Sequence, residues 1–200
     1  MIQFLSEKTA RYLAEGDETA DIEVLAYGYY MFYQQWLTVA AILLISLPFG
    51  IFPLVLASLV TSMVLRGCVG GTHARHPVTC KITTFLLAFL PALFAGIPDA
   101  GFVLAFIVVS FLLSGVLVLK YAPGETDVRK FHPNIRKRLK VKALVWVCGF
   151  SLVAGFLYGS YTAIAFVVSV SLFLTCCFAH PLAYRLFGFD PVTKEPFRPR

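Results

Sequence analysis

The chain has 200 residues, of which 58% are hydrophobic and only 14% are charged, whereas charged residues make up about a quarter of an average soluble domain. This composition excludes an ordinary soluble domain and indicates an integral membrane protein. The net charge of +6 does not predict a nucleic-acid partner, because the Lys and Arg residues lie between hydrophobic runs, where they favour contacts with membrane lipid.

Residues 1–16 predict an amphipathic helix that lies on the membrane interface. Apolar residues recur there at helical spacing, with Glu7, Lys8, Arg11 and Glu15 between them. The segment lacks the basic start, the short apolar run and the small-residue cleavage site of a secretory signal peptide. We therefore expect the mature chain to begin at Met1.

Hydrophobic runs in the rest of the chain predict an all-α membrane domain with about six transmembrane helices. The first run is long enough to cross a hydrocarbon core of about 30 Å, whereas the second is short or tilted. The expected spans are 24–47, 51–65, 82–97, 102–119, 143–158 and 161–178. They leave a reactive loop at 66–80, a basic loop at 120–142 and a polar tail at 181–200.

The positive charges predict how these spans are oriented. With the N-terminus in the cytoplasm, all 17 Lys and Arg residues fall on the cytoplasmic side, and the outer loops near Gly50, Asp99 and Gly159 carry none. This distribution satisfies the positive-inside rule. We therefore expect a multi-pass membrane protein with both termini and the loop at 66–80 in the cytoplasm.

Reactive residues are concentrated between Arg66 and Cys80, in the sequence RGCVGGTHARHPVTC. Pro77 favours the first turn of a helix, which places Cys80 close to a helix N-terminus. The partial positive charge of that N-terminus, with Arg75 and Lys81 nearby, favours the thiolate form of the cysteine. Cys80 is therefore the candidate nucleophile. The other cysteines are expected to be structural: Cys68, Cys148, Cys176 and Cys177.

A cysteine nucleophile needs a base, and two histidines precede Cys80 in this stretch. His73 can approach the sulfur because Gly70 and Gly71 allow the chain to fold back. His76 is the competing partner, although the proline that follows it disfavours helical geometry at that position. The residues alone leave both histidines open. The two glycines are also candidates to bring backbone N–H groups to a developing oxyanion.

Another interpretation is a small six-span transporter or exporter with a cytoplasmic His/Cys gate or metal site. Cys68, His73, His76 and Cys80 have the residue types of a four-ligand zinc site, but their spacings of five, three and four residues do not match a compact zinc knuckle. The last four expected spans contain no charged residue of the kind that lines an ion path. Both observations weigh against this interpretation, which is kept as the alternative, and the expected site holds no metal.

The stretch resembles a motif of the accessory gene regulator protein B family of Gram-positive quorum-sensing systems. The shared pattern is an arginine, then Gly-Gly-x-His-Ala, then a cysteine seven residues after the histidine: Arg66, Gly70, Gly71, His73, Ala74 and Cys80. A second match follows the fourth span and consists of Tyr121-Ala122-Pro123, the acidic residues Glu125 and Asp127, and the basic run from Arg136 to Lys140. The segment RKFHPNI departs from the family pattern and leaves His132 without a role.

The resemblance implies a cysteine endopeptidase of the bacterial cell membrane that acts on a short pheromone precursor peptide and needs no cofactor. Cys80 would be the nucleophile and His73 the general base and acid. The precursor would remain on Cys80 as a thioester until its own internal Cys or Ser closed a thiolactone or lactone ring. The family also implies a homodimer. The candidates for binding the substrate are cationic: Arg66, Arg75, Arg136, Lys137, Arg138 and Lys140.

Overall fold

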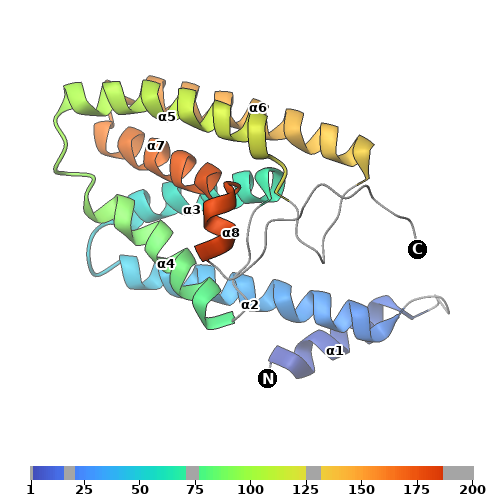
Figure 1. The fold of residues 1–200 in the computed structure, drawn as a ribbon. Helices are drawn as coiled ribbons and strands as arrows, with labels where there is room; N and C mark the ends of the chain where they lie inside the picture. Colours follow the sequence, from blue (N-terminus) through green and yellow to red (C-terminus); the bar gives the residue numbers. More distant parts are fainter. Residues whose placement is uncertain (1, 16–20, 71–76, 125–131, 187–200) are drawn as a thin grey trace. The chain divides into compact units, whose positions relative to one another are not determined.

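The computed structural model describes residues 2–15, 21–70, 77–124 and 132–186, and over these ranges the chain forms eight α-helices and no strand (Figure 1). The all-α prediction is therefore confirmed. The helices are α1 (Ile2–Leu13), α2 (Ile22–Ser46), α3 (Phe52–Val69), α4 (Pro77–Leu93), α5 (Ala100–Tyr121), α6 (Pro133–Leu157), α7 (Thr162–Cys177) and α8 (Pro181–Leu186).

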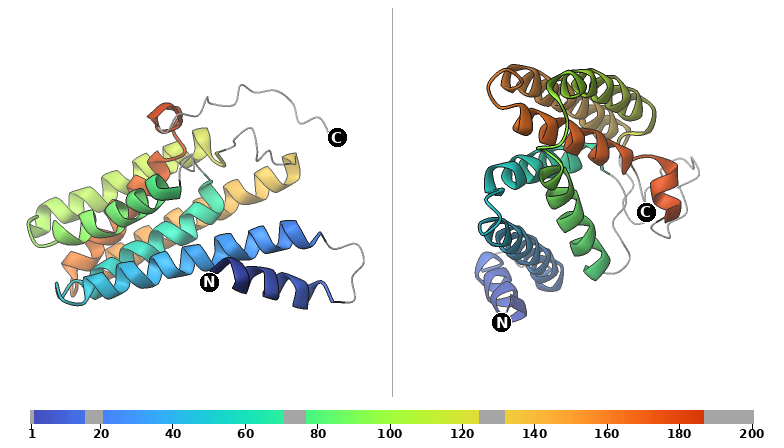
Figure 2. Two further views of the ribbon diagram at one scale, coloured as in Figure 1. Left: turned by 90° about the horizontal axis from the view of Figure 1, so that it is seen from below. Right: turned by 90° about the vertical axis from the view of Figure 1, so that its left-hand side faces the viewer.

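The helices fall into two compact units, Met1–Leu47 and Pro48–Arg200. In the first unit, α1 packs against α2 as an antiparallel hairpin (Figure 2), and the hydroxyls of Thr9 and Tyr33 share a hydrogen bond of 3.0 Å. Asp21 caps α2, because its side chain accepts hydrogen bonds from the backbone N–H groups of Glu23 and Val24. A helix thus forms where the interfacial helix was expected, while its place on a membrane surface stays a prediction.

The second unit is built around α7, which contacts α3, α4, α5 and α6 (Figures 1 and 2). One buried hydroxyl joins three of these helices: Ser58 donates to the carbonyl of Leu87 on α4 at 2.9 Å and shares a hydrogen bond of 2.7 Å with Ser171 on α7. At the end of the unit where α3, α5 and α7 terminate, a core cluster consists of Leu65, Val69, Val118, Ala122, Ala143, Val147, Leu172, Cys176 and Ala179.

Three of the described helices, α3, α5 and α6, are long and apolar enough to cross a membrane. The stretch Cys80–Leu93 and helix α7 are apolar but shorter. Large apolar side chains point outward on these helices, for example Phe156, which is 88% exposed, as expected for a surface that contacts lipid rather than water. These features support a membrane protein. The long helix α2 is not among the three, since tyrosines and two glutamines lower its hydropathy, and the count of six spans stays a prediction.

Helices extend beyond several expected spans. Helix α3 continues through Arg66 to Val69, and α6 begins at Pro133, well before the span expected from 143. The basic residues Arg136 to Lys140 therefore lie on a helix and not in a loop. His132 is the N-cap of this helix and accepts a hydrogen bond from the N–H of Asn134 at 3.5 Å, which gives this histidine a structural role.

Candidate active site

The Cys80 thiol lies in the first turn of α4, as the proline pattern predicts. The side chain is half-buried, and all five cysteines of the chain are free thiols. The backbone carbonyl of Cys80 accepts a hydrogen bond from the hydroxyl of Thr84 at 2.9 Å, as is common between helical residues four positions apart. The sulfur is therefore carried by the N-terminal turn of a helix.

Arg66 supplies a second positive charge to this region from the last turn of α3. The guanidinium interacts electrostatically with Cys80, and its carbon lies 5.0 Å from the centroid of the Phe178 ring. A guanidinium over an aromatic face within about 6 Å makes a favourable cation–π contact. The side chain is half-buried, so the contact fixes a cation that is partly shielded from water. Arg66 thus joins the ends of α3 and α7 beside the thiol.

The end of α3 is also joined to the segment that follows α5. The N–H of Gly124 donates to the carbonyl of Val69 at 2.8 Å, and Gly70 and Gly124 form an isolated parallel β-bridge. Gly70 has φ +69° and ψ −146°, a conformation that only glycine adopts readily. Its own N–H donates to the carbonyl of Arg66 at 3.2 Å and is therefore already engaged in ending the helix.

An aromatic contact joins the end of α5 to the residues after α7. The rings of Tyr121 and His180 meet edge to face, with their centroids 4.7 Å apart, and the ammonium of Lys120 lies 5.4 Å from the centre of the tyrosine ring. His180 Nδ1 accepts the N–H of Leu182 at 3.2 Å, which leads the chain into α8. Sequence reasoning missed both Phe178, the last residue of an expected span, and His180, which follows it closely, because no motif in the sequence includes them.

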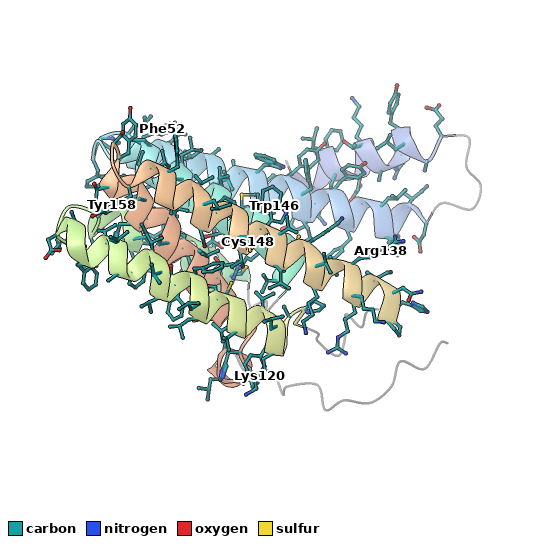
Figure 3. All side chains as sticks on the ribbon, turned by 90° about the horizontal axis from the view of Figure 1, so that it is seen from above. Phe52, Lys120, Arg138, Trp146, Cys148 and Tyr158 are labelled. Atoms are coloured by element: carbon teal, nitrogen blue, oxygen red, sulfur yellow. The ribbon has the colours of Figure 1, made fainter. Side chains whose placement is uncertain are left out.

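The remaining predicted site residues separate into those that the structure describes and those that it does not. Arg136, Lys137 and Arg138 are exposed on the first turns of α6, and Lys140 is half-buried there. In Figure 3, Arg138 and Lys120 lie toward one end of the second unit, and Phe52 and Tyr158 lie toward the other. The predictions for four residues fall outside the described residues: Gly71, His73, Arg75 and His76.

None of the other four cysteines lies at a helix N-terminus. Cys176 is buried and Cys177 half-buried in α7, Cys68 packs against the core cluster, and Cys148 is exposed on the apolar surface of α6. Within the described ranges, no group of three or more His, Cys, Asp or Glu side chains is placed to hold a metal ion. The zinc alternative stays open, since two of its four ligands, His73 and His76, lie outside these ranges.

Comparisons with known proteins identify the family. A model described as Accessory gene regulator B matches residues 6–179. The chain is 26% identical over 151 residues to an AgrB-like protein of Clostridium acetobutylicum, a match that covers 74% of this chain and 70% of that protein. It is 31% identical over 102 residues to the accessory gene regulator protein B of Staphylococcus intermedius, which covers 50% of this chain and 53% of that protein. No solved structure matches the chain.

The family match runs through all of the helices that meet at this end of the second unit. It includes Cys80, Arg66 and its aromatic partner Phe178, and both glycines of the β-bridge, and it ends one residue before His180. Apart from His180, the residues that the structure gathers here are therefore part of the matched region. This all-helical membrane protein belongs to the accessory gene regulator B family of quorum-sensing proteins.

Proposed function

We propose that the protein is a membrane-embedded cysteine endopeptidase that cleaves a short pheromone precursor and promotes its cyclisation. The observation that carries this proposal is the position of Cys80, in the first turn of α4 and within the electrostatic influence of the Arg66 cation. A helix N-terminus and a neighbouring cation both stabilise a thiolate over a thiol. The other four cysteines lack this combination.

Cys80 attacks a backbone carbonyl of the precursor, and His73 acts as general base and then protonates the departing amine. The C-terminal fragment leaves with its new amino group, and the N-terminal part stays on the sulfur as a thioester. An internal Cys or Ser of the precursor then attacks the thioester carbonyl. A thiolactone or lactone forms, and the Cys80 thiol is released.

Gly71 is the better candidate of the two loop glycines for an oxyanion donor. The N–H of Gly70 is bonded to the carbonyl of Arg66, whereas the neighbouring Gly71 is the next residue toward His73 in the sequence. A backbone donor aimed at a developing oxyanion contributes about 3 to 4 kcal/mol in enzymes where it has been measured.

The cyclisation step favours a site that excludes water. A thioester is reactive enough to be hydrolysed, so the tethered thiol of the precursor must attack it before water does. We place the site at the cytoplasmic face, because the cationic ends of α3, α5 and α6 satisfy the positive-inside rule there. The exposed cations of α6 lie at this face and would bind an acidic part of the precursor. The functional assembly would be a homodimer.

Mass spectrometry of a precursor that is produced together with the protein tests the proposal. Cys80→Ala and His73→Ala are each expected to abolish cleavage while the protein still accumulates in the membrane. Cys68→Ala is the matched control, because Cys68 belongs to the same stretch but packs against the core cluster, and it should retain cleavage. Normal processing by the Cys80→Ala protein would refute the endopeptidase.

A further inference from the structure

We propose that Gly70 and Gly124 are positioning residues. In this proposal, their backbone pairing, called here the glycine clasp, holds the Cys80 end of the site in register with the basic first turns of α6. The inference rests on the proposed function for its consequence in catalysis, but the clasp itself can be tested separately. It was not visible in the sequence, where 53 residues separate the two glycines in a chain with 14 glycines.

The geometry of the clasp requires glycine at position 70. A Cβ added to Gly70 would lie 2.7 Å from the carbonyl oxygen of Gly124 and 3.1 Å from its nitrogen. Both atoms belong to the backbone, so neither can move aside as the end of a side chain would. The positive φ of Gly70 is a second, independent obstacle, since L side chains rarely adopt it. Any other residue at position 70 must therefore break the clasp or strain it.

The clasp is fixed to the interior of the second unit on both sides. Val69, whose carbonyl accepts the Gly124 N–H, is completely buried, and Ala122 is 3% exposed. Pro123, directly before Gly124, is also fully buried. Each side of the clasp therefore continues a packed segment, and the pairing cannot be a contact between two loosely attached chain ends.

The position of the clasp in the chain gives it a function. Gly70 comes directly before the residues that connect α3 to Cys80, and Gly124 comes directly before those that connect α5 to the basic turns of α6. The clasp thus fixes the starting points of both connections relative to each other. A precursor whose acidic part binds the cations of α6 is thereby presented to Cys80 in one register. A misplacement of about 1 Å can reduce a rate about a hundredfold.

Gly70→Ala tests the clasp, and Gly67→Ala is its matched control. Gly67 lies in the last turn of α3, the helix that Gly70 caps, and a Cβ added there would have no atom within 4 Å. Two measurements are made on each full-length protein in membranes or detergent: hydrogen–deuterium exchange of the Gly124 amide, and kcat and KM for precursor cleavage. We expect Gly70→Ala to lose protection at Gly124 and to lower kcat at least tenfold, with KM for the precursor within twofold, because the α6 cations are unchanged. Gly67→Ala should match the wild type in both.

Three results would overturn the proposal. In the first, the Gly124 amide of Gly70→Ala stays protected from exchange. In the second, this amide loses its protection but kcat of Gly70→Ala stays within twofold of the wild type. Should Gly70→Ala not accumulate, kcat and KM of Gly124→Pro decide, since proline removes the N–H that bonds to Val69. A Gly124→Pro protein with unchanged kcat is the third contradicting result. If the wild type cleaves no precursor, the proposed function fails. The comparison of Gly124 amide exchange between the wild type and Gly70→Ala still shows whether the clasp exists.

Discussion

The guanidinium carbon of Arg66 lies 5.0 Å from the centroid of the Phe178 ring, so the last turn of α3 and the end of α7 meet at the cation that interacts with Cys80. Cation–π contacts contribute about 0.5 to 1 kcal/mol at exposed sites and about 2 kcal/mol where the cation is desolvated. Arg66 is half-buried and falls between these limits. The ring therefore helps to hold a positive charge beside the candidate nucleophile, although Phe178 itself carries no reactive group.

Replacing Phe178 by Leu should slow the alkylation of Cys80 by iodoacetamide about fivefold, because about 1 kcal/mol of support for the Arg66 cation is lost. Phe178→Tyr keeps an aromatic face and should react like the wild type. The measurement uses a protein in which Cys80 is the only cysteine, with the modified peptide quantified by mass spectrometry at one pH. Equal rates for the Leu and Tyr variants would show that the ring does not support the cation.

A second prediction concerns the buried hydroxyls that join α3 to α7. Ser58 gives its single proton to the carbonyl of Leu87, so Ser171 is the donor in the 2.7 Å bond between the two serines. Hydrogen bonds between membrane helices contribute about 0.6 kcal/mol on average and at most about 1.7 kcal/mol. A double-mutant cycle of Ser58→Ala and Ser171→Ala, measured by unfolding in detergent, should give a coupling in this range.

Ser169 provides the control for that cycle. Its hydroxyl is also buried in α7 but donates to the carbonyl of Ala165 on the same helix at 2.9 Å. Ser169→Ala combined with Ser58→Ala should therefore give effects that add, because independent sites do not couple. A coupling as large for Ser169 as for Ser171 would indicate a general loosening of the helices and not the loss of one hydrogen bond.

The sequence was sufficient for features that depend on neighbouring residues. Pro77 marks the start of α4 and places Cys80 in its first turn, because the preference of proline for that position is local. The start of α6 was missed, although Pro133 at its first turn carries the same signal. Hydropathy was used to predict that boundary, and the basic first turns of α6 have low hydropathy.

Other features depend on packing and could not be predicted. The need for glycine at position 70 comes from the backbone of Gly124, and the importance of Phe178 comes from Arg66 on another helix. Each of these pairs joins segments that are far apart in the sequence. The pairing of Cys80 with His73 rests on the family resemblance alone, because His73 lies outside the described residues.

The orientation of α6 can be tested with one cysteine near its start and one just beyond its end. At about 1.5 Å per residue, its 25 residues are long enough to cross the hydrocarbon core. In a cysteine-free background, Ser160→Cys should react with an impermeant maleimide added to intact cells, and Arg138→Cys should react only after permeabilisation. Both positions are exposed, so access by the reagent does not favour either one. Labelling of both from the same side would exclude α6 as a span.

The last prediction concerns the exposed cations Arg136, Lys137 and Arg138 on the first turns of α6. Replacing all three by Gln should raise KM for an acidic precursor about tenfold or more and leave kcat nearly unchanged, because three surface ion pairs contribute up to about 1 kcal/mol each. Gln is chosen over Glu so that the remaining cations, including Lys120 and Lys142 on the same side of the expected topology, still orient the protein.

Two further measurements, one at varied ionic strength and one with a modified precursor, show whether these cations bind the substrate or anchor the protein in the membrane. If they bind the precursor, KM of the wild type should rise with ionic strength, and KM of the Gln variant should change little, because screening acts on pairs that the variant lacks. A precursor whose acidic residues are replaced by Gln should bind both proteins equally. If the Gln variant instead loses kcat for both precursors, or fails to accumulate, the three cations serve the orientation of the protein in the membrane and not the recognition of its substrate.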